Sequence, residues 1–362
     1  MIPLQKIIFG PPGTGKSYSI DQIAKEYQIQ DENKIKTVFH PDYIYGDFIG
    51  KLMPLSDENG KPSYKYYPGY FLRALGKAYE NILTNPSEPE HVFLVIDEIN
   101  RGNAAAIFGS VFQLLDRNEI GWSEYHIMMS DIEIDTLIKL SGYKFNESKK
   151  NSKNIYLDAY HSSNNHKEFV SEIDPDKKND AIKKHIQECV AASPLYKPLD
   201  ELIISKNIKL PPNLSLIATM NTSDESIYYM DSAFKRRWEW EPLPVNDPNT
   251  KKTLDQVKIE STPFEWTAFV DKLNAFILSQ SQAIRRIEDK QVGYYFIKPV
   301  TENQQKYIKK DAIKNKLLFF LWDNVFTRDK SILAQKIGVK ELKTFYHFAE
   351  AVDKFIENIM NF

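Results

Sequence analysis

Residues 4–27 read LQKIIFGPPGTGKSYSIDQIAKEY, and this stretch decides the fold of the chain. The apolar run 4–9 predicts a short buried strand, and 19–27 predicts a helix. Between them, GPPGTGKS (10–17) has the spacing G-x-x-x-x-G-K-[ST]. Glycines in such a loop let backbone N–H groups converge on phosphate oxygens, and the helix N-terminus adds positive potential. The stretch therefore predicts a phosphate-binding loop at the start of an α/β domain.

Length and composition are those of an ordinary globular protein. The 362 residues can hold one large domain and a smaller one. A net charge of −2 argues against a broadly basic protein that coats nucleic acid. Cys189 is the single cysteine, which fits a reducing cytoplasm, and no apolar run approaches the roughly 18 residues of a membrane span. We therefore expect a cytoplasmic protein with no membrane partner.

Two stretches supply the predicted chemistry of phosphate transfer. Lys16 is expected to reach the β and γ phosphates, and the Ser17 hydroxyl to bind Mg²⁺. The apolar strand in HVFLVIDEINRGN (91–103) ends at Asp97, which is expected to complete the Mg²⁺ shell. Glu98 follows and is expected to orient and deprotonate the attacking water. The residues predicted to bind the nucleotide are Gly10, Pro11, Pro12, Gly13, Thr14, Gly15, Lys16, Ser17, Tyr18 and Asp97.

A third apolar strand, LSLIATMN (214–221), ends in Asn221, whose amide could hold the lytic water or a γ-phosphate oxygen. The following SIYYMDSAFKRR (226–237) predicts a helix that carries Arg236 and Arg237 roughly 15 Å away. At that distance the arginines would serve the γ-phosphate of the next subunit in a ring, Arg237 more directly than Arg236. The alternative is a surface pair flanked by Glu239.

Together these motifs resemble an AAA+ NTPase, and more narrowly the McrB family of GTP-dependent motor subunits in type IV, modification-dependent restriction systems. The Met-Asn-Thr-x-Asp stretch at 220–224 points to McrB, whereas DEINR is shared with MoxR-type chaperones. The other stretches that carry the resemblance are VFHPDYIYGDFIG (38–50), YYPGYFLRAL (66–75), DSAFKRRW (231–238), DKQVGYYF (289–296) and LLFFLWDNVF (317–326).

The resemblance implies an αβα parallel-sheet P-loop domain at 1–245 and a helical lid at 246–362. It implies GTP with Mg²⁺ as cofactors, a ring expected to be a hexamer, and a separate McrC-like nuclease subunit that acts on DNA in phage defence. Gly293 in the lid is expected to lie near the bound nucleotide. The residues themselves do not discriminate between GTP and ATP. A MoxR-like, ATP-driven remodeller of protein complexes is the alternative.

The chain departs from the family pattern in three places. Glu225 stands where the family usually has arginine, and Tyr294 where it usually has histidine. The phosphate-loop strand begins the chain, so we expect no N-terminal DNA-reading domain.

A long interruption, about 118–210, is predicted to be an insert that contacts a partner, with a tolerated surface elaboration as the alternative. We expect 145–180 to be polar and linker-like, followed by a helix in AIKKHIQECVA (181–191). Within the insert, His161, His166, His185 and Cys189 could hold zinc, although their irregular spacing argues against it. Beyond it, apolar residues at helical spacing in 265–280 and 341–360 predict a helical core.

Overall fold

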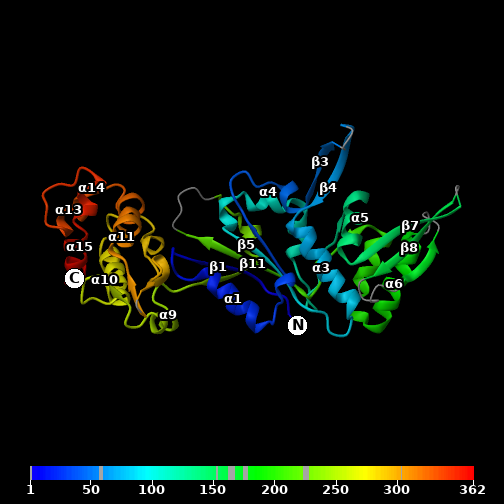
Figure 1. The fold of residues 1–362 in the computed structure, drawn as a ribbon, viewed down its shortest axis with the longest axis horizontal. Coiled ribbons are helices and arrows are strands. Elements are labelled where there is room, and N and C mark those ends of the chain that lie inside the picture. Colours follow the sequence, from blue (N-terminus) through cyan, green and yellow to red (C-terminus); the bar gives the residue numbers. More distant parts are fainter. Residues whose placement is uncertain are drawn as a thin grey trace. The chain divides into compact units, whose positions relative to one another are not determined.

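The computed structural model describes residues 2–56, 60–151, 154–161, 168–173, 178–222, 228–302 and 304–362. The chain forms two compact units, whose elements Figure 1 labels. Unit 1 consists of Met1–Ile7, Ile20–Thr219 and Ser226–Trp240, and unit 2 of Ile8–Ser19, Met220–Glu225 and Glu241–Phe362. The residues of the phosphate loop therefore group with the C-terminal part of the chain.

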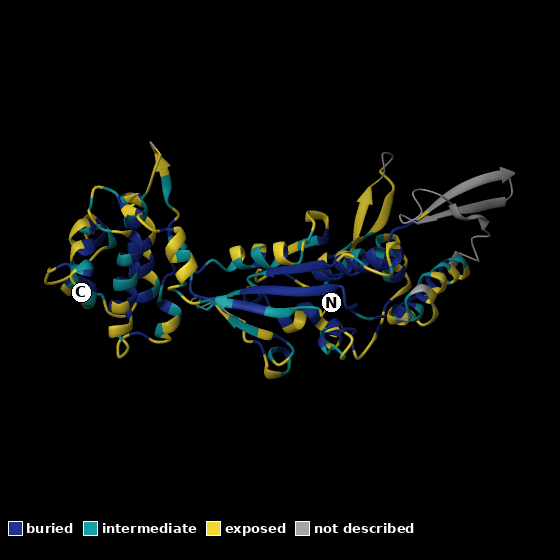
Figure 2. Cartoon of the chain, turned by 90° about the horizontal axis from the view of Figure 1, so that it is seen from below, coloured by how far each residue is buried: buried dark blue, intermediate teal, exposed yellow. Residues whose placement is uncertain are grey.

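A five-stranded sheet carries the predicted motifs. Its order is β12-β1-β11-β5-β2, with bounds β1 (Gln5–Gly10), β2 (Lys34–Val38), β5 (Val92–Asp97), β11 (Leu214–Asn221) and β12 (Glu239–Pro242). Strand β5 pairs in parallel with both β11 and β2. Its five apolar residues are all buried, as expected for a strand covered on both faces, and Figure 2 shows the central strands in the buried colour. The α/β fold is thus confirmed.

The helices before the C-terminal region are α1 (Lys16–Glu26), α2 (Tyr45–Phe48), α3 (Tyr70–Thr84), α4 (Ala104–Phe108), α5 (Asp131–Leu140), α6 (Lys178–Ala192), α7 (Asp200–Ile204) and α8 (Ser232–Lys235). Helix α3 buries an apolar face that packs against β5 and α5. Helix α5 begins with a capping box, in which Ser130 N donates to Glu133 Oε2 at 2.8 Å. Helix α3 thus lies between the sheet and α5.

Three small antiparallel sheets lie within the described residues of unit 1. Strands β3 (Gly50–Ser56) and β4 (Pro62–Pro68) form a hairpin that projects from the helices around it (Figure 1). In the insert, β6 (Ile127–Met128) pairs with β10 (Asn207–Ile208). Strands β7 (Tyr143–Asn151), β8 (Asn154–His161) and β9 (Glu168–Ile173) form the third small sheet. The expectation of a linker at 145–180 is wrong for the described residues, because strand pairing satisfies the backbone despite the polar sequence. The predicted helix at 181–191 is confirmed as part of α6.

Unit 2 contains a helical core. Its helices are α9 (Pro248–Thr253), α10 (Trp266–Ser279), α11 (Lys310–Ala312), α12 (Leu318–Phe320), α13 (Ser331–Lys336), α14 (Phe345–Glu350) and α15 (Val352–Met360). Strands β13 (Lys258–Ile259), β15 (Gln305–Ile308) and β14 (Val300–Glu302) form a small sheet in that order. The apolar faces of α10 and α15 share one buried cluster, which confirms the predicted helices. In the described part of the chain, no helix combines the length and apolar character of a membrane span.

Candidate nucleotide site

The phosphate loop connects the end of β1 to the first turn of α1. Gly13 and Gly15 have φ of 82° and 90°, in the left-handed region that favours glycine. Ser19 N donates to Gly15 O at 2.9 Å, so the helix begins immediately after the loop. The N-terminus of an 11-residue helix therefore follows the loop directly, as an anion site requires.

Lys16 is held at the loop itself. Its Nζ donates to Gly10 O at 2.8 Å and to Pro11 O at 3.0 Å, and Thr14 Oγ1 donates to the same Pro11 oxygen at 3.0 Å. Ser17 and Tyr18, which follow, are exposed. The loop thus combines a positioned ammonium group and an accessible hydroxyl, the two groups that a magnesium–nucleotide complex uses.

Two backbone hydrogen bonds connect this loop to the segment around Gly293. Gly293 N donates to Pro12 O at 2.9 Å, and Tyr295 N donates to Gly13 O at 3.0 Å. A Cβ placed on Gly293 would lie 2.3 Å from Gly13 O, and one placed on Gly13 would lie 2.3 Å from Phe296 N. Both glycines are therefore required by a close approach of two backbones. The structure thus brings the predicted Gly293 against the predicted loop.

Tyr294 is anchored behind this contact. Its hydroxyl donates to Asp271 Oδ1 at 2.5 Å, and Trp266 Nε1 donates to its carbonyl oxygen at 2.7 Å. Burial, together with the Asp271 carboxylate, raises the pKa of Tyr294 above its usual range. Tyr294 is therefore neutral and acts as a buried hydrogen-bond donor where the family pattern expects histidine.

Asp97 and Glu98 form a second cluster, at the end of β5 in unit 1. Asp97 Oδ1 accepts from Thr219 Oγ1 at 3.1 Å, and Asp97 Oδ2 pairs with Lys36 Nζ at 2.6 Å. Thr219 Oγ1 also accepts from Glu98 N at 3.2 Å. Sequence reasoning missed Lys36 and Thr219, because each looks like an ordinary strand residue and only strand pairing places it beside Asp97.

Glu98 has an uncommon backbone conformation, with φ 55° and ψ 46°. A glutamate in the left-handed region is strained, and such strain concentrates at functional positions. The Arg101 Nε lies 3.8 Å from Glu98 Oε2. Six other described non-glycine residues also have a positive φ, so this conformation supports the motif at Glu98 but does not identify the residue by itself.

The predicted metal ligands fit Mg²⁺ by their chemistry. Asp97 supplies a carboxylate and Ser17 a hydroxyl, and Mg²⁺ prefers oxygen ligands from one or two carboxylates together with substrate phosphates. Among the described residues, no group of three or more His, Cys, Asp or Glu side chains could form a dedicated metal cage. His185 and Cys189, whose Nε2 and Sγ atoms lie 3.9 Å apart, therefore belong to no such group among the described residues, while His166 and the side chain of His161 lie outside the description.

The segment that carries the arginine pair differs from the prediction. Residues 223–227 lie outside the described residues, and 228–230 are not helical. Helix α8 spans only Ser232–Lys235, because the Asp231 side chain caps it by accepting from Phe234 N at 2.7 Å. The long helix expected over 226–237 is therefore wrong, and so is the spacing of roughly 15 Å derived from it.

The two arginines have different surroundings. Arg237 Nη2 pairs with Asp116 Oδ2 at 2.5 Å, and its guanidinium lies 4.0 Å from the centre of the Phe112 ring. Only 8% of the Arg237 side chain is exposed, whereas Arg236 is an exposed residue. Arg237 is therefore engaged within its own chain, and Arg236 is the member that can reach another subunit. Asn221 is half-buried at the end of β11.

Known proteins share this organisation. Residues 5–132 match the AAA domain (dynein-related subfamily). The whole chain is 28% identical to the Type II restriction enzyme BsuMI component YdiS of Bacillus subtilis (strain 168), over 89% of that protein. A stretch of 32% of the chain is 33% identical to the Type IV methyl-directed restriction enzyme EcoKMcrB subunit of Escherichia coli (strain K12), over 24% of that protein.

A solved structure of a protein from Cytophaga hutchinsonii aligns over 97% of this chain and 84% of its own, at 12% identity. Its TM-score of 0.28 is too low to support an argument about the fold. The assignment rests instead on the matched domain, the phosphate loop at its start and the full-length similarity. Residues 5–132 thus match an AAA domain, and the chain as a whole is similar to a component of a restriction enzyme.

Proposed function

We propose that this protein hydrolyses GTP as the motor subunit of a restriction complex, in which a separate McrC-like nuclease cuts foreign DNA. The observation that carries this proposal is the similarity to a restriction enzyme component, which extends over the whole chain rather than the nucleotide-binding part alone. The phosphate loop supplies the means of hydrolysis. The nuclease activity is assigned to a partner, because the sequence has no acidic cluster of the nuclease kind.

The proposed roles follow from the positions of the side chains. Lys16 would bind the β and γ phosphates, and Ser17 and Asp97 would hold Mg²⁺, whose charge would offset that of the phosphates. Glu98 orients and deprotonates the attacking water, and Asn221 holds that water or a γ-phosphate oxygen. Lys36, already paired with Asp97, holds this carboxylate in place. Arg236 is proposed to act across a subunit interface.

The preference for GTP rests on the resemblance to McrB alone. The test is the turnover of GTP and ATP by the purified full-length chain, with and without DNA and a candidate nuclease subunit. We expect GTP to be hydrolysed preferentially and the nuclease subunit to raise the rate. Preferential ATP turnover that responds to neither DNA nor a nuclease would contradict the proposal and favour a MoxR-like remodeller of proteins.

Glu98→Gln tests the chemical step separately. The substitution keeps the size of the side chain but removes the general base, so we expect nucleotide binding and assembly to persist while turnover falls at least about a hundredfold. The matched control is Glu119→Gln, which makes the same change at an exposed glutamate outside the site. Near-normal turnover of Glu98→Gln would remove this residue from the role of base.

A further inference from the structure

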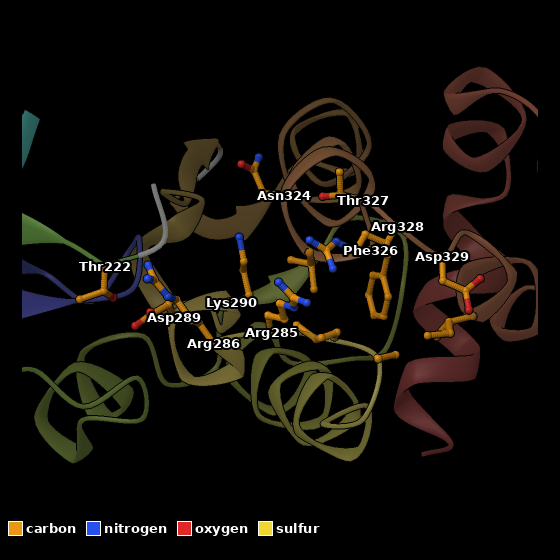
Figure 3. A pocket seen from close by; sticks show the side chains of 14 residues that line it. Thr222, Arg285, Arg286, Asp289, Lys290, Asn324, Phe326, Thr327, Arg328 and Asp329 are labelled. Atoms are coloured by element: carbon orange, nitrogen blue, oxygen red, sulfur yellow. The ribbon is translucent and has the colours of Figure 1, made fainter. Parts of the chain in front are cut away.

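A cavity of about 350 Å³ lies within unit 2, between the loop 283–290 and the segment 324–332. Four cationic side chains line it together with two carboxylates, which leaves a formal charge of +2. These side chains are Arg285, Arg286, Lys290 and Arg328, with Asp289 and Asp329 (Figure 3). The Asp329 carboxylate already accepts a hydrogen bond from Ser331 N at 2.8 Å. The cavity is thus a cationic site to which no role has been assigned.

Lys290 is the most informative of these residues. Only 8% of its surface is exposed, and among the described residues it forms neither a hydrogen bond nor an ion pair. The neighbouring Asp289 attracts it without reaching ion-pair distance. Figure 3 shows the Lys290 amine pointing from its loop into the cavity, toward Asn324. An amine that points into a cavity and forms no ion pair is available to an anion there, which would complete its hydrogen bonding.

A second polar group at the cavity also lacks a partner. The Thr222 Oγ1 atom is buried and, in the described part of the chain, has no hydrogen bond of normal geometry, although it lies near the Asp289 carboxylate. Across the cavity, Asn324 belongs to a π-helical turn, Leu321–Val325, a local irregularity that often marks functional sites. Hydroxyl and amide donors therefore accompany the cations.

We propose that this cavity binds a phosphate group, at a site separate from the phosphate loop. Guanidinium forks match the oxygens of a tetrahedral oxyanion, the Lys290 amine supplies a point charge, and the Thr222 hydroxyl supplies a further donor. The volume accommodates free phosphate or the phosphate of a small phosphomonoester. This assignment does not depend on which nucleotide the protein hydrolyses.

The position of the cavity gives its occupant a route to the predicted catalytic machinery. Thr222 and Asp289 also line a second cavity of about 390 Å³ that reaches Gly10 and Pro11. Thr222 directly follows Asn221 in the chain. A phosphate bound through Thr222 would therefore act on the residue next to the predicted γ-phosphate sensor.

The test is calorimetric titration of inorganic phosphate into the full-length chain without nucleotide, in a phosphate-free buffer. We expect binding that Lys290→Met, an apolar replacement of similar length, weakens at least tenfold. Arg328→Gln, a change at an exposed residue, should weaken phosphate binding severalfold. This variant tests the site even if Lys290→Met fails to fold. Lys272→Met is the matched control at a half-buried lysine outside the cavity and should bind phosphate normally.

Two further titrations show where the phosphate binds and whether the ligand is free phosphate or a phosphomonoester. Lys16→Ala should retain the binding, because the proposed site lies outside the phosphate loop, and acetate should not compete. If guanosine monophosphate competes with phosphate in the Lys16→Ala variant, the ligand is a phosphomonoester. If it does not compete, the ligand is free phosphate. The proposal is overturned if the unsubstituted chain binds no phosphate, or if Lys16→Ala abolishes binding while Lys290→Met and Arg328→Gln preserve it. Failure of nucleotide hydrolysis leaves each of these outcomes unchanged.

Discussion

Gly13 and Gly293 are held so close together that neither position has room for a side chain. Gly13 also has a positive φ, whereas Gly293 is constrained by proximity alone. The motif at 10–17 accounts for Gly13, because such loops need glycine for phosphate binding. It does not account for Gly293, whose partner is remote in the sequence. The chemistry of the loop and the packing of the C-terminal region thus depend on the same backbone contact.

Gly293→Ala should show this dependence. The added Cβ overlaps the Gly13 carbonyl, so the two backbones must separate and the hydrogen bond to Pro12 O is weakened or lost. We expect a cost of about 1–3 kcal/mol in stability and at least tenfold weaker nucleotide binding. Thermal unfolding and titration with a fluorescent nucleotide measure the two effects. Gly46→Ala is the control, since its nearest neighbour would lie at an ordinary 3.4 Å; equal behaviour of both variants would contradict the prediction.

At the scale of single elements, α8 shows that the position of a helix cap decides where the two arginines after the helix lie. The Asp231 side chain caps the N-terminus of α8. This helix has only four residues, so it is too short to carry the arginines far from the cap. Phe234 and Trp238 are buried beside Phe108, which fixes the end of the element in the core. Arg237 is thereby directed onto Asp116, and Arg236 remains at the surface.

Arg237→Ala should therefore act on stability. It removes the ion pair with Asp116 and the contact with the Phe112 ring, and leaves a carboxylate of which 31% is exposed. We expect a loss of about 2–3 kcal/mol. Arg236→Ala changes an exposed side chain and should cost no more than about 0.5 kcal/mol. Urea unfolding of both variants makes the comparison, and coincident midpoints would contradict it.

Removing the small sheet β7–β8–β9 should separate the response to DNA or a partner from nucleotide hydrolysis itself. Replacing 145–177 with a short Gly-Ser linker deletes most of this sheet and stops before α6. We expect basal nucleotide hydrolysis to persist and stimulation by DNA or a nuclease partner to fall, because none of the predicted phosphate-contacting residues lies in the deleted range. Turnover assays with and without the partner distinguish the two. Loss of nucleotide binding would show instead that the core needs this sheet.

Strands β1, β5 and β11 could be predicted because each contains a mainly apolar run, followed by the first glycine of the phosphate loop in β1 and by a polar residue in β5 and β11. Helix α10 could be predicted because its apolar positions recur at helical spacing. The beginning of α8 is predicted wrongly, because the helix predicted over 226–237 starts before its true N-cap. Asp231 followed by Ser232 is a recognisable N-cap, and it marks where the helix begins. The strands β7, β8 and β9 lie in a stretch where polar and charged residues interrupt the apolar ones, so the sequence favours a linker there, and it is the backbone pairing that defines them. The contacts of Lys36 and Gly293 arise only from strand order and tertiary packing, which no local pattern encodes.

At the scale of the whole molecule, the exposed Arg236 leads to a prediction about assembly. If it serves the γ-phosphate of a neighbouring subunit, Arg236→Ala should lower turnover by a factor of about 10³ or more while its own phosphate loop stays intact. Lys16→Ala protein is inactive for the opposite reason. Mixing the two should restore part of the activity, because some interfaces then combine an intact Lys16 with an intact Arg236.

Steady-state turnover of mixtures at several ratios measures this effect. The control mixture pairs Lys16→Ala with Glu98→Gln, which both act on the nucleotide of their own subunit and should not complement. If Arg236→Ala alone retains full turnover, the pair is an ordinary surface feature and a neighbour's active site does not depend on it.

The hydrogen bond from Gly293 to Pro12 joins residues that are 281 positions apart, from 12 to 293. At roughly 5–20 residues per second, a ribosome needs about 15–55 s to add the residues between them. Throughout that interval the loop has been synthesised but its backbone partner has not. The phosphate loop is therefore made well before it can reach its final geometry. Contacts of such long range also slow folding, because the closure entropy is lost before they form.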